Sequence, residues 1–395
     1  MMNGGTKSWR RRFPGGRISR RIPCLLLAGL FGAGAALAQD GYWINAGGGN
    51  WSVAANWDAA DGIAGGADNT AYFGFARESA LAANATFTLS GAQTIGNLCF
   101  TTQAGPASWS FNPSAGGSLT LAATFGPSQI TVTSPSLQVS LNVVVAGGSG
   151  VQKDGPGTLV LAARNTYAGP TLVTGGALNV SGWIGTGKVT VNHATLSGSG
   201  TISGPVVIGS GGTFSPGTVG GPLTINNSLV LLPGSTTSVT LNGHPAVQGL
   251  TSITYGGTLF VNNLSGTLSL GQSFTLFGAA AAGGNFSGIQ PAPGPWMRWR
   301  FNPATGQITV VSSASQPIFS TVGVAGTSLV CQVTAGPPGS PCSLLAATNL
   351  AQPLSSWIPI ATNTFDVSGA FTCTNDFGAN PPGQVYLTTQ VNPTP

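Results

Sequence analysis

Histidine and glutamate, two side chains that often transfer protons in enzymes, are nearly missing from this 395-residue chain. The two histidines, His193 and His244, have no cysteine, aspartate or glutamate beside them at the spacing of a zinc site. Glu78 is the single glutamate, which excludes a glycosidase that works with a pair of glutamates. The chain also lacks the G-x-S-x-G nucleophile motif and the G-x-G-x-x-G phosphate-binding motif. These features predict a protein that is not an enzyme.

Aspartates leave two weaker candidates for chemistry. Asp154 stands alone in the middle of the chain, whereas a polysaccharide lyase or hydrolase needs several acids and a base on one face. Asp58, Asp61 and Asp68 form the one acidic cluster and could bind Ca²⁺ together with turn carbonyls. Their spacing matches no defined calcium loop, and Asp in Gly-rich turns usually accepts backbone hydrogen bonds. We predict no metal ion and no cofactor, with calcium at this cluster as the alternative.

Aromatic side chains crowd the segment from residue 42 to residue 75 and could stack against sugar rings. The set consists of Tyr42, Trp43, Trp51, Trp57, Tyr72, Phe73 and Phe75. Within it, Trp43, Trp51 and Trp57 are the candidate glycan-stacking residues. The alternative is that the same rings pack together as a cap at one end of the fold, since aromatic rings gain most from burial.

Four cysteines follow residue 38: Cys99, Cys331, Cys342 and Cys373. An exported protein can form disulfides. A bond between Cys331 and Cys342 would close a small loop, but the sequence does not decide the pairing among Cys331, Cys342 and Cys373. Free cysteines buried in strands are an equally open alternative, because alternating residues flank each of them.

Basic residues gather at the start of the chain, where seven lysines and arginines lie within the first 21 residues. An apolar run from Cys24 to Leu37 and the small-x-small end at Ala36–Ala38 follow them. This order predicts a signal peptide, residues 1–38, cleaved before Gln39. The apolar run is shorter than the roughly 20 residues of a membrane-spanning helix, so we expect no integral membrane protein after cleavage.

The charge that remains after cleavage is close to neutral. Six basic and eight acidic residues follow position 38. No basic cluster is left to neutralise phosphates, which argues against nucleic-acid binding. Apolar residues make up 42% of the chain and recur in short runs, so the composition predicts a folded protein and not a disordered linker.

Short runs of alternating apolar and polar residues dominate the chain and predict strands separated by Gly, Ser, Asn and Pro turns. The pentad Gly-[Thr/Ser/Ala]-Leu-x-[Leu/Val] begins at residues 117, 157, 176, 257 and 266. A β-sandwich or barrel could also use such strands. A common period near 20 residues, short strands and turn asparagines favour a right-handed parallel β-helix, an all-β solenoid whose coils bury their apolar faces by stacking.

The stretch from Val151 to Val180 resembles the autotransporter-associated β-strand repeat, G-x-G-T-L-x-L-x-x-x-N-T-Y-x-G-x-T-x-V-x-x-G-x-L-x-V. The matching residues are Gly155, Gly157, Thr158, Leu159, Leu161, Asn165, Thr166, Tyr167, Gly169, Thr171, Val173, Gly176, Leu178 and Val180. The resemblance implies a passenger-like β-helix. The chain shows no strand series long enough for the translocator barrel of a true autotransporter, so self-transport is not expected.

We divide the chain into a signal peptide (1–38), an aromatic-rich N-terminal cap (39–90), a β-helix (91–313), a linker (314–317) and a small β-sandwich-like module (318–395). The predicted function is an exported, non-enzymatic structural or adhesion protein of the bacterial cell surface or extracellular space, or of the periplasm. Polysaccharides or cell-surface glycans are the expected partners. The alternative is a polysaccharide-binding module that acts through the N-terminal aromatics; less favoured is a β-helix lyase or hydrolase.

Overall fold

The structure, a computed structural model, describes residues 39–75, 82–102, 106–217, 221–264, 266–294, 297–313, 317–378 and 384–391. These residues form β-strands and two short 3₁₀ helices, η1 (Ala54–Asn56) and η2 (Leu354–Ser356), and no α-helix. Accordingly, no helix in the described part of the chain is long and apolar enough to cross a membrane. The predicted signal peptide lies outside the described residues.

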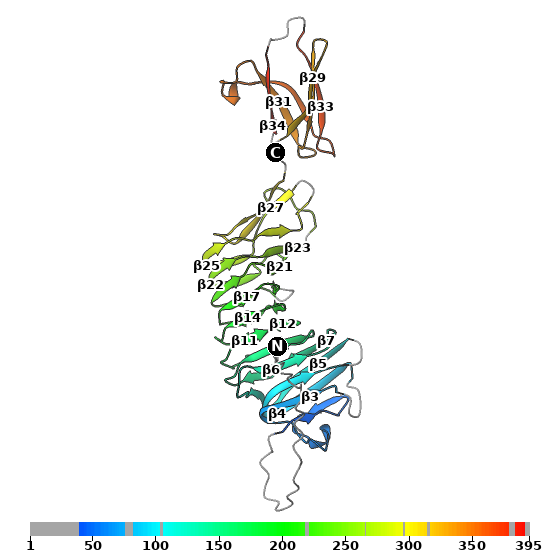
Figure 1. The fold of residues 1–395 in the computed structure, drawn as a ribbon, viewed down its shortest axis with the longest axis vertical. Helices are drawn as coiled ribbons and strands as arrows, with labels where there is room; N and C mark the ends of the chain where they lie inside the picture. The colour runs from blue at the N-terminus through cyan, green and yellow to red at the C-terminus, as the bar shows by residue number, and fades with distance from the viewer. Residues whose placement is uncertain are drawn as a thin grey trace, which may run out of the picture. The chain divides into compact units, whose positions relative to one another are not determined.

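A 25-stranded parallel sheet winds into a β-helix, which confirms the predicted solenoid (Figure 1). Successive coils place strands at the same positions, so the sheet consists of three columns. Column 1 contains β2 (Gly48–Asn50), the start of β4 (Asn84–Phe100), the start of β5 (Ala107–Leu121), β7 (Leu137–Leu141), β10 (Thr158–Leu161), β12 (Ala177–Val180), β15 (Thr195–Gly198), β18 (Thr213–Pro216), β21 (Thr236–Leu241), β23 (Thr258–Asn263) and β26 (Gly288–Gln290).

The other two columns are built in the same way. Column 2 contains the middle of β4, the end of β5, β8 (Val144–Ala146), β13 (Trp183–Ile184), β16 (Thr201–Ile202), β19 (Leu223–Ile225) and the start of β22 (Val247–Tyr255). Column 3 contains β1 (Gly41–Tyr42), β3 (Gly66–Phe73), the end of β4, β6 (Ser128–Val132), β9 (Val151–Asp154), β11 (Thr171–Val173), β14 (Val189–Val191), β17 (Val206–Ile208), β20 (Ser228–Leu231), the rest of β22 and β25 (Phe277–Gly284).

Alternation along each strand sorts the side chains into an inner and an outer set. In β10, for example, Leu159 and Leu161 are fully buried while Thr158 and Val160 are half-buried on the outside. The side-chain period of two in a strand has this effect wherever one face is covered. The interior therefore forms one continuous apolar core along the β-helix.

The repeat at residues 151–180 supplies β9 to β12. One coil takes about 20 residues here, since Thr158 lies opposite Gln138 on one side and Ala177 on the other, so the repeat covers more than one coil. We expect the coil to be right-handed, because crossovers that join parallel strands almost always have that sense. Parallel pairing begins with β1 and β3, inside the segment 39–90 that we expected to form a cap.

An antiparallel sheet follows the last coils. It consists of β24 (Ser273–Thr275), β28 (Gln307–Ser312) and β27 (Met297–Asn302), in that order. Phe301 of β27 packs edge-on against Tyr255, with ring centroids 4.8 Å apart, and contacts Phe286 as well. These rings cover apolar side chains that a further coil would otherwise bury.

The C-terminal module contains two three-stranded antiparallel sheets. One has the order β29 (Ile318–Ala325), β30 (Ser328–Thr334), β33 (Phe371–Asp376), and the other the order β32 (Ile358–Thr364), β31 (Pro341–Ala347), β34 (Tyr386–Val391). Side chains from both sheets share one core, formed by Cys331, Val333, Cys342, Leu344, Phe365, Phe371 and Cys373. This arrangement confirms a small β-sandwich after the solenoid.

Candidate functional site

Lys153 brings a charge into the interior of the repeat. The residue is fully buried, and its Nζ donates hydrogen bonds to the carbonyl oxygens of Asp154, Gly155 and Gly175 at 3.0, 2.7 and 3.0 Å. Burial lowers the pKa of Lys153 to about 8, against the opposing effect of the Asp154 charge. The ammonium group therefore joins the turn after β9 to the turn after β11 on the next coil.

Asn165 has a similar structural role on the next side of the coil. Its side chain is fully buried, accepts a hydrogen bond from the Val145 amide at 3.0 Å and donates to the carbonyls of Ala163 and Trp183. Three neighbouring backbone groups thus have their hydrogen bonds completed by one amide. The other repeat residues are structural too. Leu159, Leu161 and Leu178 lie in the core, and the hydroxyls of Tyr167 and the buried Thr171 are hydrogen-bonded at 2.8 Å. The Thr166 amide donates to the Val145 carbonyl, and four glycines lie against the preceding coil: Gly155, Gly157, Gly169 and Gly176.

The three tryptophans that we considered for glycan stacking are buried. Trp43, Trp51 and Trp57 are 2%, 1% and 1% exposed, and their rings pack edge-to-face against one another. The indole nitrogens of Trp51 and Trp57 donate to the carbonyls of Ala64 and Trp51. A stacking platform needs an exposed ring face, so these residues do not form one here; they pack as the core of the first coils.

A different set of aromatic rings faces outward beside them. Tyr42 directly precedes Trp43, and Tyr72 directly precedes Phe73. Because neighbouring side chains in a strand point to opposite faces, the two tyrosines face the surface. Their rings stack with centroids 4.4 Å apart, and the ring of Phe75 lies edge-on to both. We call Tyr42, Tyr72 and Phe75 the outer aromatic cluster.

Polar groups border the outer aromatic cluster. The Asp40 carboxylate accepts a hydrogen bond from the Thr70 amide at 2.7 Å, and the Thr70 side chain bonds the Tyr72 hydroxyl. Burial raises the pKa of Tyr72, so the phenol stays protonated at neutral pH. Half-exposed rings beside a carboxylate and hydroxyls are groups that can contact both the C–H face and the hydroxyls of a sugar.

Column 1 carries uncharged polar side chains on its outer face, here called the polar face. Two rows run across the coils through directly paired positions. One row is Asn84, Ser108, Gln138, Thr158, Ala177, Thr195, Thr213, Thr236 and Thr258; the other includes Thr86, Ser110, Ser140, Val160, Asn179, Ser197 and Ser215. Neighbouring members bond from coil to coil, as in Asn179 to Ser197 at 3.2 Å. Parallel strands repeat at about 4.8 Å, so hydroxyls recur at that interval.

The acid and histidine candidates lie apart from one another. Asp68 accepts hydrogen bonds from the side chain and the backbone amide of Thr124, which lowers the pKa of its carboxyl group. Asp58 accepts a bond from the Ala60 amide, as expected for a turn aspartate. Across the described residues, no group of three or more His, Cys, Asp and Glu side chains is placed to hold a metal ion. The carboxylate of Asp154 accepts from the Thr174 hydroxyl at 3.3 Å, in line with a structural position.

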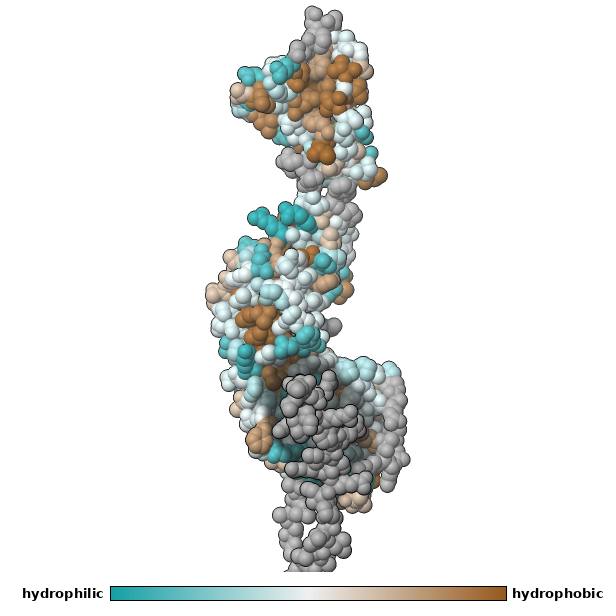
Figure 2. Space-filling model, viewed as in Figure 1, coloured by the Kyte–Doolittle hydropathy of each residue, from teal (hydrophilic) through white to brown (hydrophobic). Residues whose placement is uncertain are grey.

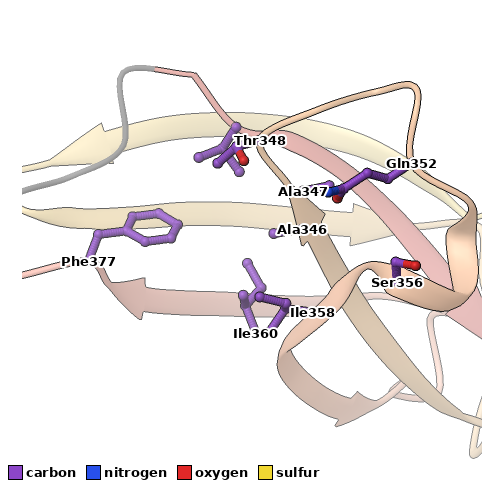
Figure 3. Close-up of a pocket in the computed structure, with 9 residues that line it drawn as sticks. Ala346, Ala347, Thr348, Gln352, Ser356, Ile358, Ile360 and Phe377 are labelled. Carbon is purple, nitrogen blue, oxygen red and sulfur yellow. The ribbon is translucent and has the colours of Figure 1, made fainter.

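A cavity of about 360 Å³ opens in the C-terminal module (Figure 3). Ala346, Ile358, Ile360 and Phe377 supply apolar walls, and Thr348, Gln352 and Ser356 supply polar groups. None of the described residues that line it is charged. Apolar side chains also gather on the visible face of this module (Figure 2). Its exposed apolar residues are Ile318, Val322, Val324, Leu350, Leu354, Ile358 and Val367.

The outer aromatic cluster was missed as a separate group because its tyrosines stand directly beside buried aromatic residues in the sequence, Trp43 and Phe73. Alternation in Tyr42-Trp43 and Tyr72-Phe73 signals two faces but does not tell which face is inside. Of the predicted turn asparagines, Asn165 is occupied inside the coil, whereas Asn179 bonds Ser197 of the next coil.

Comparison with known proteins agrees with this architecture. Residues 151–180 match the passenger-associated-transport-repeat family. Part of the chain is 38% identical over 115 residues to the adhesin BmaC autotransporter of Brucella suis biovar 1 (strain 1330), a match that covers 26% of this chain and 3% of that protein. Another match, 34% identical over 95 residues, is to an extracellular serine protease of Serratia marcescens and covers 24% of this chain and 9% of that protein.

The matches therefore span only a small part of either relative. No solved structure matches the chain. Lys153, Asn165 and the strands β9 to β12 all lie inside the matched segment. The chain thus carries a passenger-associated-transport-repeat, set within a parallel β-helix.

Proposed function

We propose that this protein is an exported, non-enzymatic adhesion module, in which the β-helix presents its polar face to neutral polysaccharides. The observation that carries the proposal is the double row of uncharged hydroxyls and amides on column 1. Direct pairing holds these groups in register, so their spacing costs little conformational entropy on binding. A polyhydroxyl ligand can exchange hydrogen bonds with such a row over many coils, and each contact can be weak.

Two further observations support this reading. One relative is an autotransporter adhesin, so a sequence similar to part of this chain occurs within a protein of that name. The similarity to the extracellular serine protease covers 9% of that protein, too little to transfer a catalytic site.

The outer aromatic cluster supports a second candidate, a local polysaccharide-binding site at the first coils. It replaces Trp43, Trp51 and Trp57 in the alternative that we drew from the sequence. Tyr42, Tyr72 and Phe75 leave part of their rings at the surface, beside Asp40 and Thr70. This site would bind one or a few sugar units, whereas the polar face would bind a chain along several coils.

The test uses purified residues 39–395 on an array of neutral and acidic polysaccharides, with binding and released sugar both measured. In the first variant, Thr195→Lys and Thr236→Lys place two ammonium groups on the polar face, two coils apart. In the matched control, Gln152→Lys and Thr190→Lys do the same on the outer face of column 3. We expect binding to weaken about tenfold or more in the first variant and to change little in the control.

The other outcomes decide between the candidates. Loss of binding in Tyr42→Ser/Tyr72→Ser, with the Lys variants unaffected, would move the site to the outer aromatic cluster. Equal losses in both Lys variants would show that neither face is specific. Release of sugar that disappears in Asp154→Asn would overturn the non-enzymatic reading.

A further inference from the structure

Two of the three cysteines in the C-terminal module lie directly opposite each other. Cys331 of β30 pairs with Cys373 of β33 in the antiparallel sheet. Directly opposite residues in such a sheet have Cα atoms about 4.5 to 5.5 Å apart, inside the range that a disulfide spans. The sequence separation of this pair is large, so only the register of the sheet reveals it.

Both thiols also point to the same side of the sheet. Cys331 is buried between Leu329 and Val333 in the alternation of β30, and Cys373 is buried two residues after Phe371 in β33. They share the inner face that forms the core of the module. Their thiols are close enough for Cys373 to raise the pKa of Cys331, and both are free thiols in the structure.

Cys342 has different surroundings. It lies on β31 in the other sheet, where Asn363 and Val391 are its register partners. Its Sγ contacts the Ser343 carbonyl at 3.9 Å. A bond between Cys331 and Cys342, which the short loop in the sequence suggested, would have to cross the sandwich; the Cys331–Cys373 bond needs no rearrangement of strands.

We propose that Cys331 and Cys373 form a disulfide across β30 and β33, and that Cys342 stays a buried thiol. Two S–H bonds break and one S–S bond forms. The two protons and two electrons pass to an external disulfide, which is reduced to a dithiol. The pairing follows from the register of the sheet and does not depend on the adhesion proposal.

Burial of the two thiols in the folded module decides at which stage of folding the disulfide can form. It raises the pKa of Cys331 to about 11, with the neighbouring Cys373 adding to the effect. At pH 7 roughly one thiol in ten thousand is then the reactive thiolate, and both sulfurs are covered. The bond therefore forms before the two sheets close, when an unfolded chain meets the external disulfide.

The experiment uses residues 39–395 secreted into an oxidising compartment and alkylated without reduction. A protease that cuts on the N-terminal side of aspartate releases residues 366–375, which contain Cys373, because Asp366 and Asp376 flank this segment. We expect the peptide to remain linked to the preceding fragment until a reductant is added. The intact chain should be about 2 Da lighter than its reduced form, for the loss of two hydrogens.

Single variants identify the partner and keep the proposal falsifiable if one of them folds poorly. Cys342→Ala and Cys99→Ala should leave the peptide linked, whereas Cys331→Ala should free it. Reduction should lower the melting temperature of the module by about 10 °C in the parent and leave Cys331→Ala/Cys373→Ala unchanged. A free 366–375 peptide in the secreted parent, or a link that disappears in Cys342→Ala, would overturn the proposal.

Discussion

Lys153 shows at the scale of one residue how the repeat stabilises its own coil. A buried ammonium is costly, and here three carbonyl oxygens from two coils surround it. Hydrogen bonds to a charged donor are stronger than those between neutral groups, so the Lys153 contacts fix the turns that they join. The repeat thus contains one buried, hydrogen-bonded ammonium group inside a largely apolar core.

The lowered pKa of Lys153 predicts a rise in stability at alkaline pH. Below about pH 8 the lysine is protonated in the folded and the unfolded chain, so its contribution does not change with pH. Between about 8 and the usual value of 10.5, the unfolded chain binds a proton that the folded chain has released. The free energy of unfolding therefore gains up to about 3 kcal/mol from this group as pH rises.

Urea unfolding of the parent and of Lys153→Met at pH 7, 8, 9 and 10 checks this. The difference between the two proteins removes the contributions of Tyr and Cys residues, which both share. The parent should gain stability relative to Lys153→Met across that range. Lys188→Met, which removes an exposed lysine, should keep the parent's pH dependence. Parallel curves for the parent and Lys153→Met would contradict the prediction.

At the scale of an element, the turn after β9 depends on close backbone contact between coils. Gly155 has φ +75°, and a Cβ there would lie 2.4 Å from the Val132 carbonyl oxygen of the preceding coil. Gly116 in β5 has nearly the same φ, +77°, but open space around it. Comparing substitutions at the two glycines therefore separates the cost of the left-handed backbone from the cost of the clash with Val132.

We expect Gly155→Ala to destabilise the protein by about 3 kcal/mol or more, and Gly116→Ala by about 1 kcal/mol. The measurement is the urea midpoint of each variant, compared once the slope of the unfolding free energy against urea concentration is shown to be the same in both. Equal losses would mean that the left-handed backbone, and not the contact with Val132, accounts for the glycine in the repeat.

At the scale of the whole molecule, pairing between successive coils makes the β-helix nearly one-dimensional. Ala177 lies opposite Thr195, so residues 177–194 form one coil containing β12, β13 and β14. Removing that coil lets β15 meet β10, β17 meet β11, and the hydroxyl of Thr195 take the place of Ala177 in the polar face. Every column then keeps its register.

We predict that the chain without residues 177–194 folds, with unchanged strand content per residue and a lower unfolding midpoint. The chain without residues 177–185 loses β12 and β13 but keeps β14, so the columns no longer match. It should be unfolded or protease-sensitive. Circular dichroism and limited proteolysis compare the two deletions, and similar behaviour of both would argue against independent coils.

Most strands, the class of fold and the repeat could be predicted from the sequence, because apolar alternation and turn residues are local signals of period two and of about twenty residues. The pentads at 157 and 176 became adjacent strands β10 and β12 as expected. The pentad at 266 did not form a strand, and the small residues from Ala279 to Gly284 became part of β25.

The inner side of those strands, and the distant residues that meet, could not be predicted in this way, because they depend on tertiary contacts. Tyr42 and Trp43 are both aromatic, so alternation alone could not assign them; stacking of β1 on β3 turns the indole inward and the phenol outward. The pairing of Cys331 with Cys373 follows from the register of β30 against β33. Such choices depend on free energies summed over contacts far apart in the chain, which a local pattern does not contain.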